Sequence, residues 1–178
     1  MDSKATPITR ITPTGLATTE REFGFDIIIY ATGFDGLTGA FDRIDIRGRD
    51  GLPLKQAWSG GARTLVGMLA EGFPNMFMLL GPHTALGNIP RSIEYNVEWV
   101  TALLRHMRER GLVEAEARPE AVADWMAHVM ECSIGLLANE VDSWFTGVNK
   151  NVEGRQTRTI ARYSGSAPAY RARCDAVA

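Results

Sequence analysis

The sequence predicts an α/β fold with a strand-rich N-terminal half and a helical C-terminal half. Two short apolar runs, at residues 27–30 and 76–80, are typical of strands buried on both faces, as in a parallel sheet. After residue 88, apolar side chains recur at helical spacing in two long segments. The length of 178 residues is enough for one domain with a substantial core.

The bulk composition is that of an ordinary globular protein, with 45% hydrophobic residues, 22% charged residues and a net charge of −2. This balance gives no reason to expect a nucleic-acid or membrane partner. The apolar runs are too short to span a bilayer, and the first twenty residues hold no signal-like apolar segment. Cys132 and Cys174 are too few for a disulfide framework, which predicts a cytoplasmic location. The three histidines stand apart, so no metal site is predicted.

The N-terminal half is expected to consist of short strands and turns. Residues 12–26 predict an exposed hairpin or meander that leads into the first buried strand. Residues 44–51 alternate and then turn, and residues 63–68 predict another strand. Residues 74–75, a Pro-Asn pair, turn the chain into the second buried strand.

The first long helix is expected to start at Asn88 as its N-cap, with Pro90 in the first turn and Gly111 as a C-cap. Its inward-facing residues are expected to be apolar and to recur every three or four positions: Ile93, Val97, Val100, Leu104 and Met107.

The second long helix is expected to open at Pro119 and to fray near Gly135. Its predicted inward face is also apolar: Val122, Trp125, Met126, Val129 and Met130. A loop at residues 144–154 follows, then a strand at residues 157–163 and a short helix capped by Ser166.

Small residues end the first apolar run. Ala31, Thr32 and Gly33 would let a bulky ligand approach the backbone closely. In open α/β sheets, ligands bind at this carboxyl end of the strands. The alternative is a core strand followed by an ordinary glycine turn.

The segment GPHTALGN, residues 81–88, runs from the second apolar run to a helix start. Unpaired N–H groups at a helix start suit an anion or a polarised carbonyl, such as the N1–C2=O edge of an isoalloxazine ring. The alternative is a capped helix that binds nothing. The sequence has no GxSxG motif and no recognisable carboxylate pair, so no catalytic residue is predicted. His83 is interpreted as a hydrogen-bonded or solvated loop residue.

Five segments together resemble the C-terminal portion of a flavin-dependent Baeyer–Villiger monooxygenase of the cyclohexanone and phenylacetone monooxygenase group. They are DIIIYATGFDGLTG, RIDIRGRDG, GFPNMFMLLGP, GNIPRSIEYNVEWV and SWFTGVN, and they occur in the family's order and at about its spacing. ATGF alone is shared with many flavoproteins, whereas the five segments together are specific.

The resemblance implies the second segment of a discontinuous FAD-binding dinucleotide domain at residues 1–142, followed at residues 143–178 by a C-terminal mobile loop, a strand and a short helix. The residues that it places against the FAD are Ala31, Thr32, Gly33, Gly87, Asn88 and Ile89. The residues that it places in the substrate-pocket loop are Thr84, Ala85 and Leu86. Trp144 matches the tryptophan of the loop that closes over the nicotinamide end of NADP.

The chain also departs from the family pattern. It has no GxGxxG turn for either dinucleotide and no FxGxxxHxxxW fingerprint. The family's catalytic arginine belongs to an NADPH domain that is absent here. The loop after Trp144 is longer than usual and lacks the family's proline.

The resemblance therefore implies part of an FAD- and NADPH-dependent monooxygenase that inserts one oxygen atom of O2 into a small ketone to give an ester or lactone. The chain alone is expected to be inactive, to bind FAD and NADP weakly or not at all, and to self-associate. The alternative is a stand-alone, non-catalytic module that pairs with another chain.

Overall fold

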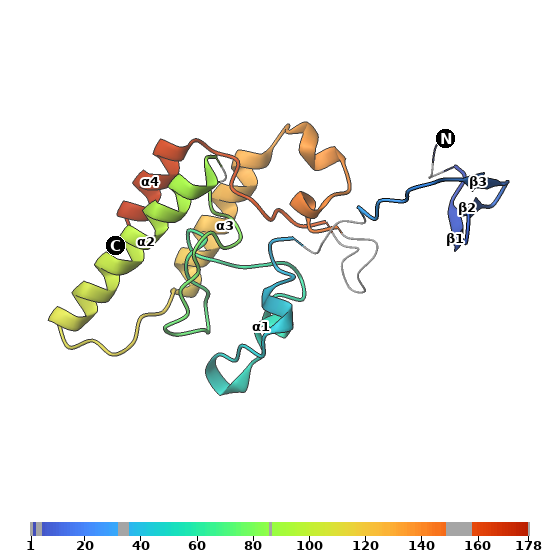
Figure 1. Ribbon diagram of the computed structural model, residues 1–178. Helices are drawn as coiled ribbons and strands as arrows, with labels where there is room; N and C mark the ends of the chain where they lie inside the picture. Colours follow the sequence, from blue (N-terminus) through green and yellow to red (C-terminus); the bar gives the residue numbers. More distant parts are fainter. Residues whose placement is uncertain (1, 3–4, 32–35, 86, 149–157, 178) are drawn as a thin grey trace. The chain divides into compact units, whose positions relative to one another are not determined.

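The computed structural model describes residues 2, 5–31, 36–85, 87–148 and 158–177, apart from the side chain of Trp144 (Figure 1). The chain divides into two compact units, Met1–Phe34 and Asp35–Ala178. A small antiparallel sheet occupies the first unit, and the helices lie in the second. The predicted mixed α/β character is confirmed.

The first unit is a three-stranded antiparallel meander of β1 (Ile8–Thr12), β2 (Gly15–Thr18) and β3 (Glu22–Gly24), in the order β1-β2-β3. Gly15 is required at the first turn because a Cβ there would collide with the carbonyl group of Phe23. The exposed pair Arg10–Glu22 joins β1 to β3 with an N–O distance of 2.7 Å. The meander predicted for residues 12–26 is therefore confirmed, and it begins four residues earlier.

The prediction of a buried strand at residues 27–30 is wrong for this structure. Ile27, Ile29 and Tyr30 are 79%, 84% and 68% exposed, and the segment is extended without strand pairing among the described residues. An apolar run becomes a buried strand only when neighbouring strands accept its backbone hydrogen bonds and cover its faces. No described segment does so here.

Two further predicted strands are also wrong. At residues 76–80 only Met78 is buried, Leu79 is 52% exposed, and the segment is irregular. Residues 63–68 enter a tight turn that is closed by a bridge between Leu65 and Leu69. Val66 adopts a left-handed backbone conformation in that turn, with φ of 46°, which a continuing strand does not allow.

The second unit consists of helical segments joined by long irregular connections. Its α-helices are α1 (Leu54–Ala57), α2 (Ile89–Glu109), α3 (Pro119–Ser133) and α4 (Ala167–Asp175). Its short 3₁₀ segments are Phe41–Arg43, Arg49–Gly51, Leu137–Glu140 and Trp144–Thr146.

The helix ends follow the local sequence signals. The side chain of Asn88 caps α2 by accepting from Arg91 N, and that of Ser166 caps α4 by accepting from Ala169 N. Gly111 and Gly135 follow α2 and α3 with φ of 65° and 75°, values that favour glycine. These starts and stops were predicted.

The buried face of α2 includes Val100 and Met107, as predicted, but is rotated away from the other predicted residues. Val97 and Leu104 are 42% and 47% exposed. Helix α4 runs alongside α2, and the face of α2 that carries Asn96 and Trp99 packs against it (Figure 1). Trp99 Nε1 donates to the carbonyl of Cys174 over 3.0 Å, and Asn96 Nδ2 donates to Tyr170 Oη over 3.2 Å. Both contacts join α2 to residues more than seventy positions away.

Helix α3 buries Val122, Trp125 and Val129 as predicted, but Met130 is 52% exposed. Beyond the undescribed residues 149–157, the described part of the strand predicted at residues 157–163 is an extended segment without a regular ladder. It forms one parallel bridge, between Tyr163 and Ala85. This bridge connects the segment before α4 to the segment before α2.

Within the described ranges, no helix combines the length and apolar character needed to cross a membrane. The same ranges contain no group of three or more His, Cys, Asp and Glu side chains arranged to hold a metal ion.

Candidate functional site

A cavity of about 370 Å³ lies between the start of α2 and the start of α4. Three of the predicted site residues line it: Ala85, Gly87 and Asn88. A Cβ added at Gly87 would meet no atom within 4 Å, so the backbone there is open to the cavity. The structure therefore gathers part of the predicted site around an accessible glycine.

The start of α2 leaves few backbone donors for a ligand. Asn88 Oδ1 accepts from Arg91 N over 3.2 Å, and Pro90 has no N–H to offer. Ser92 N already donates to the carbonyl of Asn88 over 3.0 Å. The N–H of Ile89 is thus the first-turn donor left among the described residues, at the positive end of the helix dipole.

The charged side chains in the described lining of this cavity are cationic. Arg91 of α2 and Arg171 of α4 line it, and none of its described lining residues is a carboxylate. The guanidinium of Arg171 lies 4.9 Å from the ring centre of Tyr95. Burial, together with the neighbouring Cys174 and Asp175, raises the pKa of Tyr95, which therefore remains a neutral phenol. The cavity suits a ligand with a negative or polarised edge.

Helix α2 also holds the loop that precedes it. Ser92 Oγ donates to the carbonyl of Ala85 over 3.0 Å, and Leu80 N donates to Asn96 Oδ1 over 3.1 Å. Leu80 and His83 both have left-handed backbone conformations, with φ of 61° and 69°. Such conformations persist only where surrounding contacts hold them.

His83 joins this loop to two distant segments. Its ring is fully buried, with Nδ1 2.9 Å from Thr64 Oγ1 and Nε2 2.7 Å from the carbonyl oxygen of Ile160. Burial lowers the pKa of His83 to about 4, against the weaker opposing effect of the Ile160 carbonyl. His83 is therefore neutral at pH 7 and structural in this fold, which agrees with its interpretation as a hydrogen-bonded residue.

The other predicted site residues are placed as follows. Thr84, within the loop, is buried with its hydroxyl against Gly67 and does not line the cavity. Ile89 is 49% exposed beside the cavity. Ala31 is exposed and belongs to the other compact unit.

Four predicted residues are outside the description in whole or in part. Thr32, Gly33 and Leu86 lie outside the described residues. Trp144 begins a 3₁₀ segment, and its side chain is not described.

Sequence reasoning missed the residues that α4 and the interior of α2 contribute. Arg91 lies three residues after Asn88, and Tyr95 lies four residues after Arg91, so helical periodicity could have placed them on the same face. Tyr170 and Arg171 come from α4, some eighty positions later, and no local signal links them to Asn88. The arrangement can bind and orient a ligand, and none of the described residues lining it is placed as a general acid or base near pH 7.

The chain is similar over its whole length to curated monooxygenases, although no protein-family model matches it. It is 36% identical over 180 residues to 2-oxo-Delta(3)-4,5,5-trimethylcyclopentenylacetyl-CoA monooxygenase of Pseudomonas putida, covering 100% of this chain and 33% of that protein. It is 39% identical over 169 residues to acetone monooxygenase (methyl acetate-forming) of Gordonia sp. (strain TY-5), covering 93% of this chain and 31% of that protein. The chain thus spans about a third of the length of these relatives.

Solved structures give the same result. The closed crystal structure of cyclohexanone monooxygenase matches with a TM-score of 0.90 and 35% identity, over 99% of this chain and 33% of that one. The crystal structure of OTEMO in complex with FAD and NADP matches with a TM-score of 0.88 and 35% identity, over 99% of this chain and 32% of that one.

Proposed function

Because this chain is related along its whole length to the Baeyer–Villiger monooxygenases, as a piece about one third as long, we propose that it serves as a cofactor-covering part of such an enzyme. The whole protein would use FAD and NADPH to insert one oxygen atom of O2 into a small ketone, giving an ester or lactone. The observation that carries this proposal is the cavity at the start of α2, with the open backbone of Gly87 beside the N–H of Ile89.

The residues of this cavity fit one edge of a flavin. Gly87 gives room for a flat ring to approach the backbone, and the capped start of α2 directs a partial positive charge toward it. Asn88 stabilises that helix start by accepting a hydrogen bond from Arg91 N. When bound, FAD would supply the redox chemistry.

The role of this chain is then to bind and orient. Arg91, Arg171 and the helix start would stabilise negative charge on the bound edge. The loop of Thr84, Ala85 and Leu86 would form one wall for the ketone, held in place by His83 and Asn96. No catalytic residue is assigned, so the chain alone would be inactive.

The remaining assignments are part of the same proposal. Ala31, Thr32 and Gly33 would contact FAD, and Trp144 would cover the nicotinamide end of NADP. Residues 1–142 would form the second segment of a discontinuous FAD-binding domain, and residues 143–178 a mobile loop, a strand and a short helix. This division differs from that between the two compact units at residues 34 and 35.

A second candidate function is a non-catalytic module that pairs with a separate chain. The exposure of Ile27 and Ile29, at 79% and 84%, favours some partner for the apolar run at residues 27–30. A separate chain carrying the complementary strands would meet this need as well as a longer single chain.

Substitution at Gly87 tests the cofactor proposal in the complete protein. A Cβ added at Gly87 meets no atom within 4 Å, and a leucine there would extend into the proposed flavin position. We expect Gly87→Leu to weaken FAD binding roughly ten- to hundredfold, the equivalent of about 1–3 kcal/mol, with little change in apoprotein stability. Titration of FAD into folded apoprotein, with thermal melts beside it, measures both quantities.

The matched control is Gly81→Ala. A Cβ at Gly81 would collide with the carbonyl oxygen of Gly67, so this change should destabilise the fold and leave FAD affinity per folded molecule unchanged. Equal FAD affinities for Gly87→Leu and the unmodified protein would refute the proposed position of the flavin.

A further inference from the structure

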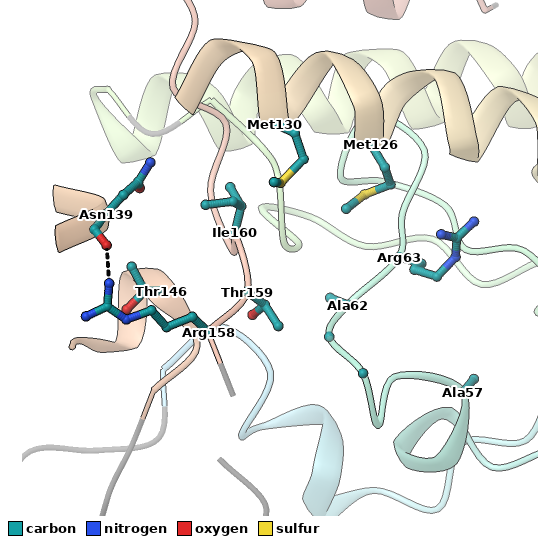
Figure 2. Close-up of a pocket in the computed structure, with 12 residues that line it drawn as sticks. Ala57, Ala62, Arg63, Met126, Met130, Asn139, Thr146, Arg158, Thr159 and Ile160 are labelled. Atoms are coloured by element: carbon teal, nitrogen blue, oxygen red, sulfur yellow. Dashed lines mark hydrogen bonds between the residues drawn. The ribbon is translucent and has the colours of Figure 1, made fainter. Parts of the chain in front are cut away.

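The second unit contains another cavity, of about 470 Å³, whose described lining residues are all different from those of the cavity at the start of α2 (Figure 2). It is bounded by the loop after α1, by one side of α3, by the 3₁₀ segments that follow α3, and by the extended segment before α4. A volume of this size is typical of small-molecule sites.

The walls of this cavity are mainly apolar. Figure 2 shows Met126 and Met130 extending from the same side of α3 into the space between Ala62 and Ile160. Methionine side chains are flexible and polarizable, so they adapt to ligands of irregular shape. Gly60 adds open backbone, since a Cβ there would meet nothing within 4 Å.

The charged residues at the cavity already have partners. Arg158 Nη2 lies 2.8 Å from Asp142 Oδ1, and its Nη1 donates to the carbonyl of Asn139 over 2.6 Å. Arg63 Nε lies 2.7 Å from Glu71 Oε1. An anionic ligand would have to compete with these carboxylates for the guanidinium groups, which disfavours it.

Neutral polar groups remain for a ligand, and the hydroxyl of Thr159 is one of them. The hydroxyl of Thr159 has no hydrogen-bond partner among the residues that the structure describes, although its backbone N–H donates to the carbonyl of Thr146 over 2.8 Å. A hydroxyl can donate to or accept from a neutral polar group. The lining therefore matches a molecule with an apolar body and a neutral polar group.

We propose that this cavity binds a neutral, mainly apolar small molecule, as a site separate from the one at the start of α2. The proposal does not depend on FAD, NADP or any reaction. It rests on the apolar walls, on the paired state of Arg63 and Arg158, and on the volume of the cavity.

Methionine-methyl NMR of the full chain tests this proposal with two isosteric probes, cyclohexanecarboxamide and cyclohexanecarboxylate. The neutral amide should shift the methyl signals of Met126 and Met130 saturably. The signals of Met68 and Met107, which do not line the cavity, should stay in place. The carboxylate should bind at least tenfold more weakly, because both arginines are already paired.

Two variants and one control locate the binding. Gly60→Leu fills open space in the cavity and should reduce amide binding at least tenfold, with Met126 as the reporter. Met130→Glu alters a side chain that is 52% exposed, so it should fold and should also weaken binding. Gln56→Leu adds a leucine at an exposed site outside the cavity and should change nothing.

Three results would each overturn the proposal: no saturable shift of Met126 or Met130, carboxylate binding as tight as amide binding, or amide binding that survives both Gly60→Leu and Met130→Glu. None of them bears on the Gly87 titration, so the two proposals can fail separately.

Discussion

The buried ring of His83 is fixed in one neutral tautomer. The carbonyl of Ile160 can only accept a hydrogen bond, so Nε2 carries the proton and donates over 2.7 Å. Nδ1 then accepts from the hydroxyl of Thr64 over 2.9 Å. The carbonyl of Pro82 lies 3.1 Å from the same hydroxyl, which can donate its one proton to only one of the two acceptors at a time.

This ring makes stability depend on pH. Above pH 6.5 the ring is neutral in both states, whereas between 6.5 and about 4 only the unfolded chain takes up the proton. Stability should therefore fall as pH drops through this window, by up to about 3 kcal/mol from this residue. In urea unfolding at pH 7.5, 6, 5 and 4.5, His83→Gln should be less stable than the unmodified protein at pH 7.5, and the difference should shrink as pH falls.

His106 supplies the control, because it is exposed on α2. His106→Gln should keep the pH dependence of the unmodified protein. If the difference between His83→Gln and the unmodified protein were constant from pH 7.5 to 4.5, His83 would not be the titrating group.

Among the elements, helices were predicted well and strands poorly, for a physical reason. The ends of α2 and α4 depend on neighbours within four residues, such as Asn88 with Arg91 and Ser166 with Ala169, so the sequence displays them locally. The apolar run at residues 27–30 needs partner strands before it can form a hydrogen-bonded ladder. The apolar pattern of the run itself does not indicate whether such strands are present. The predicted face of α2 was right at Val100 and Met107 but missed Trp99, which contacts Cys174 of the distant α4.

The cap of α2 should contribute measurably to stability. Asn88→Ala removes the acceptor for Arg91 N and should cost about 0.5–2 kcal/mol in the free energy of unfolding. Asn88→Asp keeps an acceptor oxygen at the helix start and should preserve most of that stability. Chemical denaturation of both variants at pH 7.5 measures this, and equal losses in the two would show that the cap hydrogen bond contributes nothing.

At the scale of the whole molecule, the sequence predicted only the loop and helix-start part of the candidate site. Gly87 and Asn88 are adjacent in the chain and share a cavity, as expected. Tyr170 and Arg171 reach it because α4 packs on α2 through Asn96 and Trp99, which only the folded chain reveals. The second cavity was not foreseen for the same reason, since its lining spans residues 57–160.

The exposed apolar surface should make the isolated chain self-associate. Ile27 and Ile29 are 79% and 84% exposed on an extended segment whose backbone is unpaired among the described residues. Such a segment can pair with a second copy edge to edge. Light scattering at roughly 50 µM should give a mass above 19.5 kDa that rises with concentration.

Ile27→Lys combined with Ile29→Lys should lower that mass, because charge on a strand edge opposes pairing. Val113→Lys, at an exposed apolar residue outside this segment, should leave the mass unchanged. A concentration-independent monomer would contradict the prediction, and unchanged association in the double variant would locate it elsewhere on the chain.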